Sequence, residues 1–166
     1  MTIDLLKRLM AMIVLVLIQA LVLNHVRLFY CATPMLYLLI PLHFSNKQAR
    51  WSSLLWCFCT GLLIDIFSNT PGVAAGSMTF IGLLQPYLLP LFAPKEEDVE
   101  FVPTLKELGW LKFFAYALII VLIYCLLFFT LESFSFFNLA LWGLSIGGST
   151  LLTLFIIIVW ENINKS

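Results

Sequence analysis

Long apolar segments make up most of this chain. They cover residues 9–23, 30–44, 51–67, 73–92, 111–131 and 139–160, and a membrane-spanning helix needs about 20 mostly apolar residues. The composition agrees, because 62% of the residues are hydrophobic and 11% are charged, against about 45–50% and about 25% in soluble domains. The sequence predicts a single all-α integral membrane domain over residues 1–166, built as a bundle of six transmembrane helices.

The basic residues predict how this bundle is oriented. The segment 30–44 is short and contains Pro34 and Pro41, so a re-entrant segment is the alternative to a full span. Six crossings with the N-terminus inside place eight of the nine basic residues in the cytoplasm, namely Lys7, Arg8, Lys47, Arg50, Lys95, Lys106, Lys112 and Lys165, and leave Arg27 outside. A re-entrant segment would export two of the basic loops, against the positive-inside rule. We therefore expect a multi-pass membrane protein with both termini in the cytoplasm.

The sequence lacks the patterns of an enzyme, a metal site or a nucleic-acid-binding protein. Its formal net charge is +0, so no global field attracts nucleic acid. His25 and His43 fall near opposite membrane faces and cannot serve one catalytic triad. No histidine and carboxylate cluster has metal-ligand spacing, and no glycine loop is of the phosphate-cradling type. We expect no catalytic residues, no metal and no cofactor.

The cysteines are interpreted as small buried hydrophobic residues rather than as a disulfide or a metal site. All four lie in apolar surroundings: Cys31, Cys57, Cys59 and Cys125. Two of them, Cys57 and Cys59, are two residues apart on one helix and therefore point to nearly opposite faces.

A single carboxylate, Asp65, lies inside the third apolar segment. A charged side chain at the bilayer midplane costs about 2.5–3.5 kcal/mol on insertion scales, so even an off-centre one should face protein or water. Gly61, Asp65, Ser68 and Asn69 recur at spacings of three and four, which places small and polar residues on one face of the helix. This face is suited to contact with protein.

A turn follows directly and returns the chain to the membrane. Its residues are Asn69-Thr70-Pro71-Gly72, in which proline fixes one dihedral angle and glycine permits a positive φ. Gly72 and Gly76 then form a small-xxx-small pair, which lets two helix backbones approach closely. We expect a tight antiparallel hairpin in which Asp65 accepts hydrogen bonds from the turn and from the start of the fourth helix. Two other roles for Asp65 stay open here: a protonated carboxyl bonded to a neighbouring helix, or a proton relay or substrate ligand.

Two further segments are candidates for contacts. In the last apolar segment, Gly143 and Gly147 form a second small-xxx-small pair, followed by Gly148. Such pairs pack helices inside a bundle or dock the transmembrane helix of a partner, and internal packing is the simpler expectation. The longest connection, 93–109, contains the acidic residues Glu96, Glu97, Asp98 and Glu100. We interpret it as a solvated loop, with docking of a cytoplasmic partner as the alternative.

The expected hairpin resembles that of the MreD family of rod shape-determining membrane proteins. The resemblance covers about residues 61–87: the stretch Gly61-Leu62-Leu63-Ile64-Asp65-Ile66-Phe67-Ser68, the turn with Pro71-Gly72, and the alanine- and glycine-rich helix start. It implies a fold similar to the S components of energy-coupling-factor transporters, and a non-enzymatic subunit of the machinery that elongates the bacterial cell wall. The implied partners are an MreC-like single-span protein, a RodA-like polymerase with its transpeptidase and, through the complex, the MreB filament.

A small-molecule-binding S component of a vitamin transporter is the competing expectation. Such subunits resemble one another in alanines spaced by four on the first helix, whereas here Ala11 is followed by Leu15 and Ala20 is preceded by Val16. A ligand pocket also needs convergent polar groups, and the outer half offers chiefly Asn24, His25, Arg27, Asp65, Asn69 and Glu132. The sequence therefore favours the scaffold over the transporter subunit.

Overall fold

A computed structural model describes residues 2–22, 33–93, 100–132 and 139–165 of the chain. These residues form helices and connections, and no strand occurs in the described ranges. The elements are α1 (Thr2–Leu21), η2 (Leu36–Leu38), α2 (Leu39–Leu42), α3 (Arg50–Ser68), α4 (Val73–Phe92), α5 (Leu105–Leu108), α6 (Trp110–Glu132) and α7 (Leu139–Lys165).

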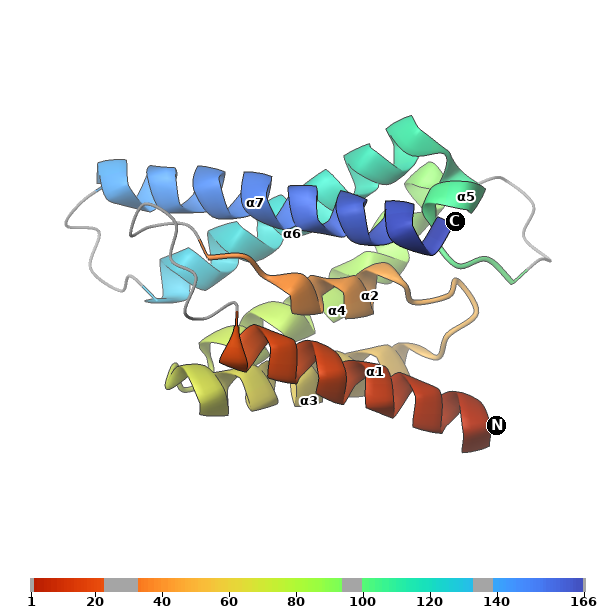
Figure 1. Ribbon diagram of the computed structural model, residues 1–166, viewed down its shortest axis with the longest axis horizontal. Helices are drawn as coiled ribbons and strands as arrows, with labels where there is room; N and C mark the ends of the chain where they lie inside the picture. Colours follow the sequence, from red (N-terminus) through yellow and green to blue (C-terminus); the bar gives the residue numbers. More distant parts are fainter. Residues whose placement is uncertain (1, 23–32, 94–99, 133–138, 166) are drawn as a thin grey trace.

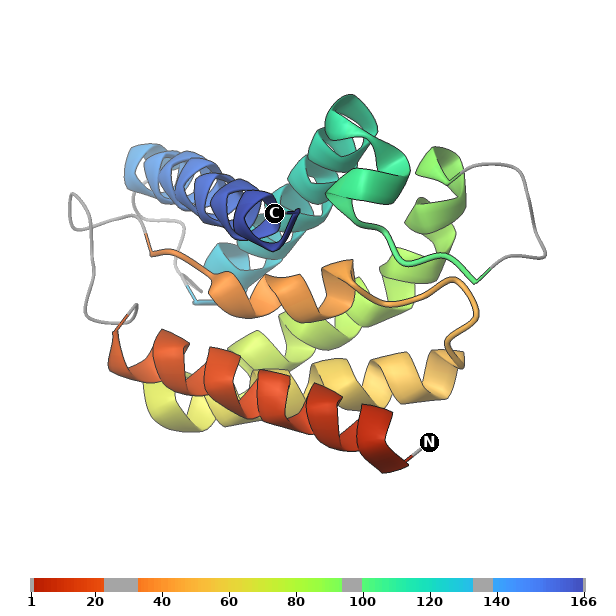
Figure 2. The ribbon, with the colours of Figure 1, turned by 45° about the vertical axis from the view of Figure 1, so that its right-hand side comes forward.

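The long helices are arranged in two layers that α4 connects (Figures 1 and 2). One layer contains α1 and α3, and the other contains α6 and α7. Helix α4 packs against α3 at one end of its path and against α6 at the other, while η2 and α2 lie between the layers. Both termini are at the same end of the bundle.

Four of the described helices are long and apolar enough to cross a membrane. They are Arg50–Ser68, Val73–Phe92, Trp110–Glu132 and Ala140–Ile163, and they agree with the expected spans 51–67, 73–92, 111–131 and 139–160. The apolar stretch of α1, Arg8–Leu21, is shorter. An all-helical, membrane-embedded chain is therefore supported, whereas the expected count of six spans is not confirmed.

The segment expected as the second span is not a continuous helix. Its described part begins with non-helical backbone at residues 33–35, and only η2 and α2 are helical. Pro34 explains the late start, because proline has no N–H to donate and disfavours helical backbone at the residue before it. Pro41 lies within the first turn of α2, where proline is tolerated.

Polar side chains of the flanking helices satisfy this irregular backbone. The hydrogen bonds run from Thr33 N to Ser149 Oγ (3.0 Å), from Met35 N to Thr153 Oγ1 (3.1 Å), from Leu36 N to Gln19 Oε1 (3.0 Å) and from Gln19 Nε2 to Pro34 O (2.8 Å). Non-helical backbone at membrane depth is tolerated only where it is buried in protein or lines water. The partners on α1 and α7 meet that condition.

Candidate functional site

The hairpin of α3 and α4 has the turn that its residues predict. Helix α3 is capped by Asn69, which adopts a left-handed conformation with φ 55° and ψ 38°, a conformation that asparagine accepts more readily than most residues. Gly72 precedes α4 with φ 82°, and glycine takes that value without a steric cost. Pro71 and Gly72 are exposed at the tip of the hairpin, and Ser68 is half-buried.

Asp65 joins the two helices through hydrogen bonds to both of its carboxylate oxygens. Oδ1 accepts from Thr70 Oγ1 and from Ala74 N, each at 2.9 Å, and Oδ2 accepts from Ala75 N at 2.8 Å. The side chain is 7% exposed. The backbone N–H groups of the first helical turn have no partner within the helix and carry the positive end of its dipole. The expected hydrogen bonds to Asp65 from the turn and from the start of α4 are therefore present.

The close approach of α3 and α4 depends on Gly61, not on the glycine pair that we expected. A Cβ added to Gly61 would lie 2.5 Å from Ala75 Cα and 2.7 Å from Ala74 O, so a side chain there would collide with the backbone of α4. A Cβ at Gly72 or Gly76 would meet no atom within 4 Å. The expectation that Gly72 and Gly76 make the contact was wrong, because these residues face away from α3 and Ala74 and Ala75 face toward it.

The glycines of α7 also point outward. A Cβ at Gly143 or at Gly147 would have no heavy atom within 4 Å, and both residues are exposed. Gly148 is half-buried. Packing within the bundle, the simpler of the two expectations for this pair, is therefore wrong for Gly143 and Gly147.

An ion pair that the sequence analysis missed ties α2 to the end of α7. His43 Nε2 is bonded to Glu161 Oε1, and His43 Nδ1 lies 2.8 Å from the Leu39 carbonyl oxygen. The other carboxylate oxygen, Glu161 Oε2, accepts from Leu105 N at 3.5 Å, which brings α5 to the same point. The two residues are 118 positions apart, so only their shared place at the predicted cytoplasmic side pointed to this contact.

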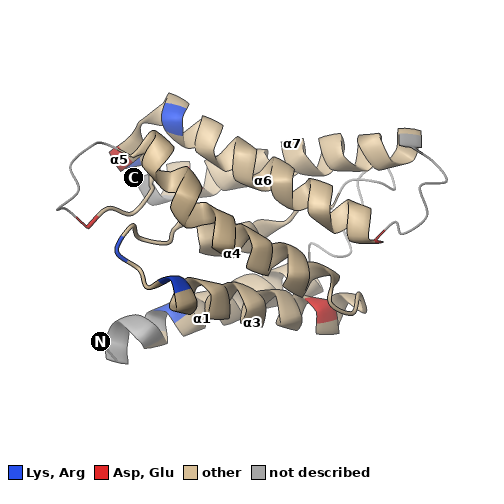
Figure 3. Ribbon diagram, turned by 180° about the vertical axis from the view of Figure 1, so that it is seen from behind, with Lys and Arg blue, Asp and Glu red and all other residues tan. Residues whose placement is uncertain are grey.

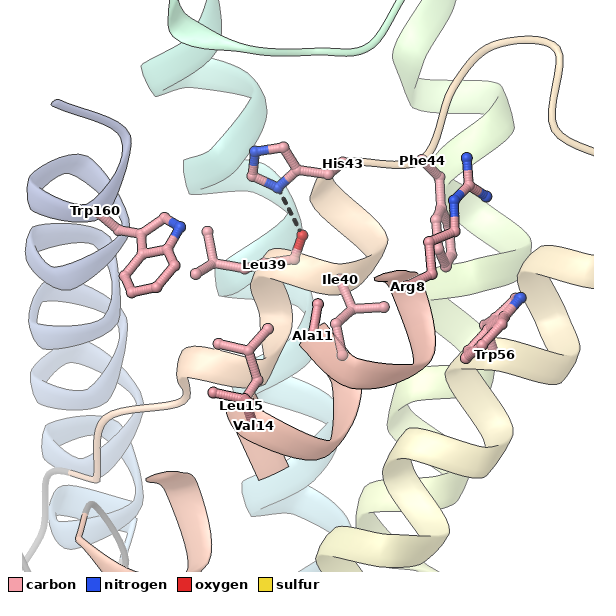
Figure 4. Close-up of a pocket in the computed structure, with 10 residues that line it drawn as sticks. All are labelled: Arg8, Ala11, Val14, Leu15, Leu39, Ile40, His43, Phe44, Trp56 and Trp160. Atoms are coloured by element: carbon pink, nitrogen blue, oxygen red, sulfur yellow. Dashed lines mark hydrogen bonds between the residues drawn. The ribbon is translucent and has the colours of Figure 1, made fainter. Parts of the chain in front are cut away.

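A cavity of about 380 Å³ lies beside this pair, between α1 and α7 (Figure 4). Leu39 and Ile40 of α2, with His43 and Phe44 directly after it, line one side of the cavity. Its walls are mostly apolar, and include Val14, Leu39, Ile40, Phe44, Trp56 and Trp160. Arg8 and His43 are the charged or titratable residues that line it.

A second hollow of about 440 Å³ adjoins the hairpin and is lined by Phe58, Leu62, Asp65, Asn69 and Pro71, among others. Its apolar walls, Phe58 and Leu62, are exposed on the outer surface of α3. Asp65 is the acidic residue that lines this hollow.

Among the described residues, no group of three or more His, Cys, Asp or Glu side chains could hold a metal ion. Cys57 and Cys125 are buried, as expected. The expectation was wrong for Cys59, which is exposed because it lies on the opposite face of α3 from Cys57. Cys31 and the acidic residues Glu96, Glu97 and Asp98 lie outside the described residues, and Glu100 is exposed.

Comparison of the chain with family models, with curated proteins and with solved structures found no match.

Proposed function

We propose that this chain is a non-enzymatic membrane scaffold subunit of the machinery that elongates the bacterial cell wall, of the MreD kind. The observation that carries the proposal is the hairpin of α3 and α4. The residues on which the resemblance depends act there as one unit, because Gly61 admits the backbone of α4 and Asp65 bonds the turn and the first turn of α4.

The bonding of Asp65 supports a structural role over proton transfer or ligand binding. Both carboxylate oxygens already accept hydrogen bonds within the hairpin. A relay group or a ligand must exchange its partners during function, whereas buried donors left without an acceptor cost about 1–3 kcal/mol each. A fully bonded Asp65 is what a rigid support for a partner requires.

Helix α7 offers the surface that a partner helix needs. Gly143 and Gly147 are exposed and leave the backbone accessible, and Leu144 and Leu151 on the same helix are 60% and 72% exposed. Close packing on small residues drives helix association in lipid, where apolar burial contributes little. In this proposal an MreC-like single-span protein docks there, and the complex recruits a RodA-like polymerase, its transpeptidase and the MreB filament.

The proposed location is the inner membrane, with six crossings and both termini in the cytoplasm. The basic residues of the described chain gather at the end of the bundle where both termini lie (Figure 3). Trp51 and Trp110 are 72% and 56% exposed at the first turns of α3 and α6, and exposed tryptophans are common at the membrane interface. These features support a cytoplasmic assignment of that end.

The hollow beside Asp65 favours a second candidate function, that of an S-component-like subunit that binds a vitamin-like molecule. Its volume of about 440 Å³ lies in the range of small-molecule sites, about 300–1,000 Å³. Two polar side chains of the described residues line it, and because Asp65 is already bonded within the hairpin, only Asn69 is left to contact a ligand.

Affinity purification of the tagged protein from its native membranes in mild detergent, followed by mass spectrometry, tests the proposal. Recovery of MreC-like and RodA-like proteins would support the scaffold. Recovery of a coupling subunit with two ATPases, or of a bound small molecule, would replace it by the transporter subunit. A membrane protein with the same tag and a similar number of spans serves as the control for non-specific recovery.

A further inference from the structure

The cavity between α1 and α7, here called the groove, has mostly apolar walls and a cation, Arg8, at one end. The cavity of about 380 Å³ is bounded by Val14 and Leu15 of α1, by Leu39 and Ile40 of α2 and by Trp160 of α7. Arg8 stands at the end of the groove away from Val14 and Leu15 (Figure 4). Val14 and Trp160 are 45% and 39% exposed, so the groove opens to the surroundings of the bundle.

Among the described residues, one N–H donor of the Arg8 guanidinium has a hydrogen-bond partner and the others are available to a ligand. One N–H, on Nη1, donates to Gln48 Oε1 at 2.8 Å, and within the described part of the chain Arg8 forms no ion pair with a carboxylate. The nearby Glu161 carboxylate is paired with His43 instead. A guanidinium presents several donors in a planar fork that matches a phosphate.

We propose that this groove binds an anionic phospholipid. One acyl chain lies over Leu39 and Ile40 between α1 and α7, and Arg8 holds the phosphate of the headgroup. The volume of the groove, about 380 Å³, is within the range of small-molecule sites. A phospholipid has a charged phosphate next to its hydrocarbon chains, and the groove has Arg8 at one end and apolar walls beyond it. The inference rests on the membrane location of the chain and not on the proposed scaffold function.

Native mass spectrometry of the purified full-length protein in mild detergent tests this site. The protein is titrated with phosphatidylglycerol and with phosphatidylcholine of the same acyl chains. Both headgroups carry the phosphate, but phosphatidylcholine adds a quaternary ammonium that repels the Arg8 guanidinium, so we expect phosphatidylglycerol to bind about tenfold more tightly. This comparison uses the unaltered protein, so it does not depend on the folding of any variant.

Two pairs of variants separate the headgroup contact from the channel. Arg8→Gln should remove the preference for phosphatidylglycerol, whereas Lys112→Gln, the same loss of charge on the exposed start of α6, should keep it. Ala11→Trp, which places a ring at the groove wall, should abolish binding of both lipids. Ile13→Trp is the control, because Ile13 is exposed on α1 and does not line the groove.

Three results would overturn the proposal. One is equal binding of the two lipids by the unaltered protein, and another is an equal loss in Arg8→Gln and Lys112→Gln. The third is a second protein chain, this one or another, that occupies the groove and excludes the lipid, since the groove would then be a helix-docking site.

Discussion

Asp65 takes hydrogen bonds from three donors that the turn and the start of α4 would otherwise leave unpaired. A membrane offers such donors no water, so the carboxylate replaces solvent inside the protein. Its cost of burial is offset by charge-assisted bonds and by the positive end of the α4 dipole.

Replacing Asp65 by leucine should therefore destabilise the bundle strongly. Asp65→Leu leaves all three donors without their acceptor, and we expect the free energy of unfolding to fall by about 2–5 kcal/mol. Asp65→Asn keeps one acceptor oxygen and should cost about 1–2 kcal/mol. Thermal unfolding in detergent measures both, and a leucine variant as stable as the unaltered protein would contradict the locking role.

Gly61 and Gly76 provide a matched test of helix contact. Gly61→Ala forces a Cβ to within 2.5 Å of Ala75 Cα, and overpacking of this kind costs about 1–3 kcal/mol. Gly76→Ala meets nothing within 4 Å and should stabilise α4 by up to about 1 kcal/mol through helix propensity. Melting temperatures that move in the same direction would show that the contact at Gly61 is not tight.

At the scale of elements, the segment with η2 and α2 depends on neighbouring helices for its hydrogen bonds. Thr153→Val removes the acceptor of the Met35 N–H group at a fully buried position, so we expect a loss of about 1–3 kcal/mol. Thr130→Val is the control, since its hydroxyl donates only to the Leu126 carbonyl of its own helix. Equal unfolding temperatures for the two variants would mean that the hydrogen bond from Met35 N to Thr153 contributes nothing to stability.

Helix α7 carries the prediction that concerns a partner. Gly147→Leu adds a side chain where the bundle has open space, so the melting temperature should not fall, and the gain in helix propensity should raise it slightly. Recovery of an MreC-like protein in affinity purification should nevertheless fall severalfold, because the docking helix can no longer approach the backbone. Gly76→Leu, at another open glycine, should leave recovery unchanged, and loss of recovery in both variants would argue against α7 as the contact.

At the scale of the whole molecule, the proposed orientation puts the end with both termini and the basic residues in the cytoplasm. Single cysteines introduced into a background without the four native ones test this. In intact cells a membrane-impermeant thiol reagent should label Pro71→Cys, at the exposed hairpin tip, and not Lys112→Cys at the opposite end. Both should react after permeabilisation, and the reverse pattern in intact cells would invert the assignment.

Local chemistry explains which features were predictable. The hydrophobic runs predicted α3, α4, α6 and α7 to within a few residues, because a membrane-spanning helix depends mainly on its own length and apolarity. The hydrogen bonds to Asp65 were predictable as well, since Asp65 and its donors at Thr70, Ala74 and Ala75 are at most ten residues apart. Within one turn and its two helix ends, sequence spacing determines distance.

Contacts between distant segments required the tertiary structure. Apolarity in segment 30–44 did not distinguish a spanning helix from a short buried one, because its backbone partners lie on α1 and α7, as far as 118 residues away. The pair of His43 and Glu161 depends on the same packing. The direction in which each glycine faces follows from the rotation of its helix in the bundle, and for that reason Gly61 makes the close contact while Gly76, Gly143 and Gly147 face outward.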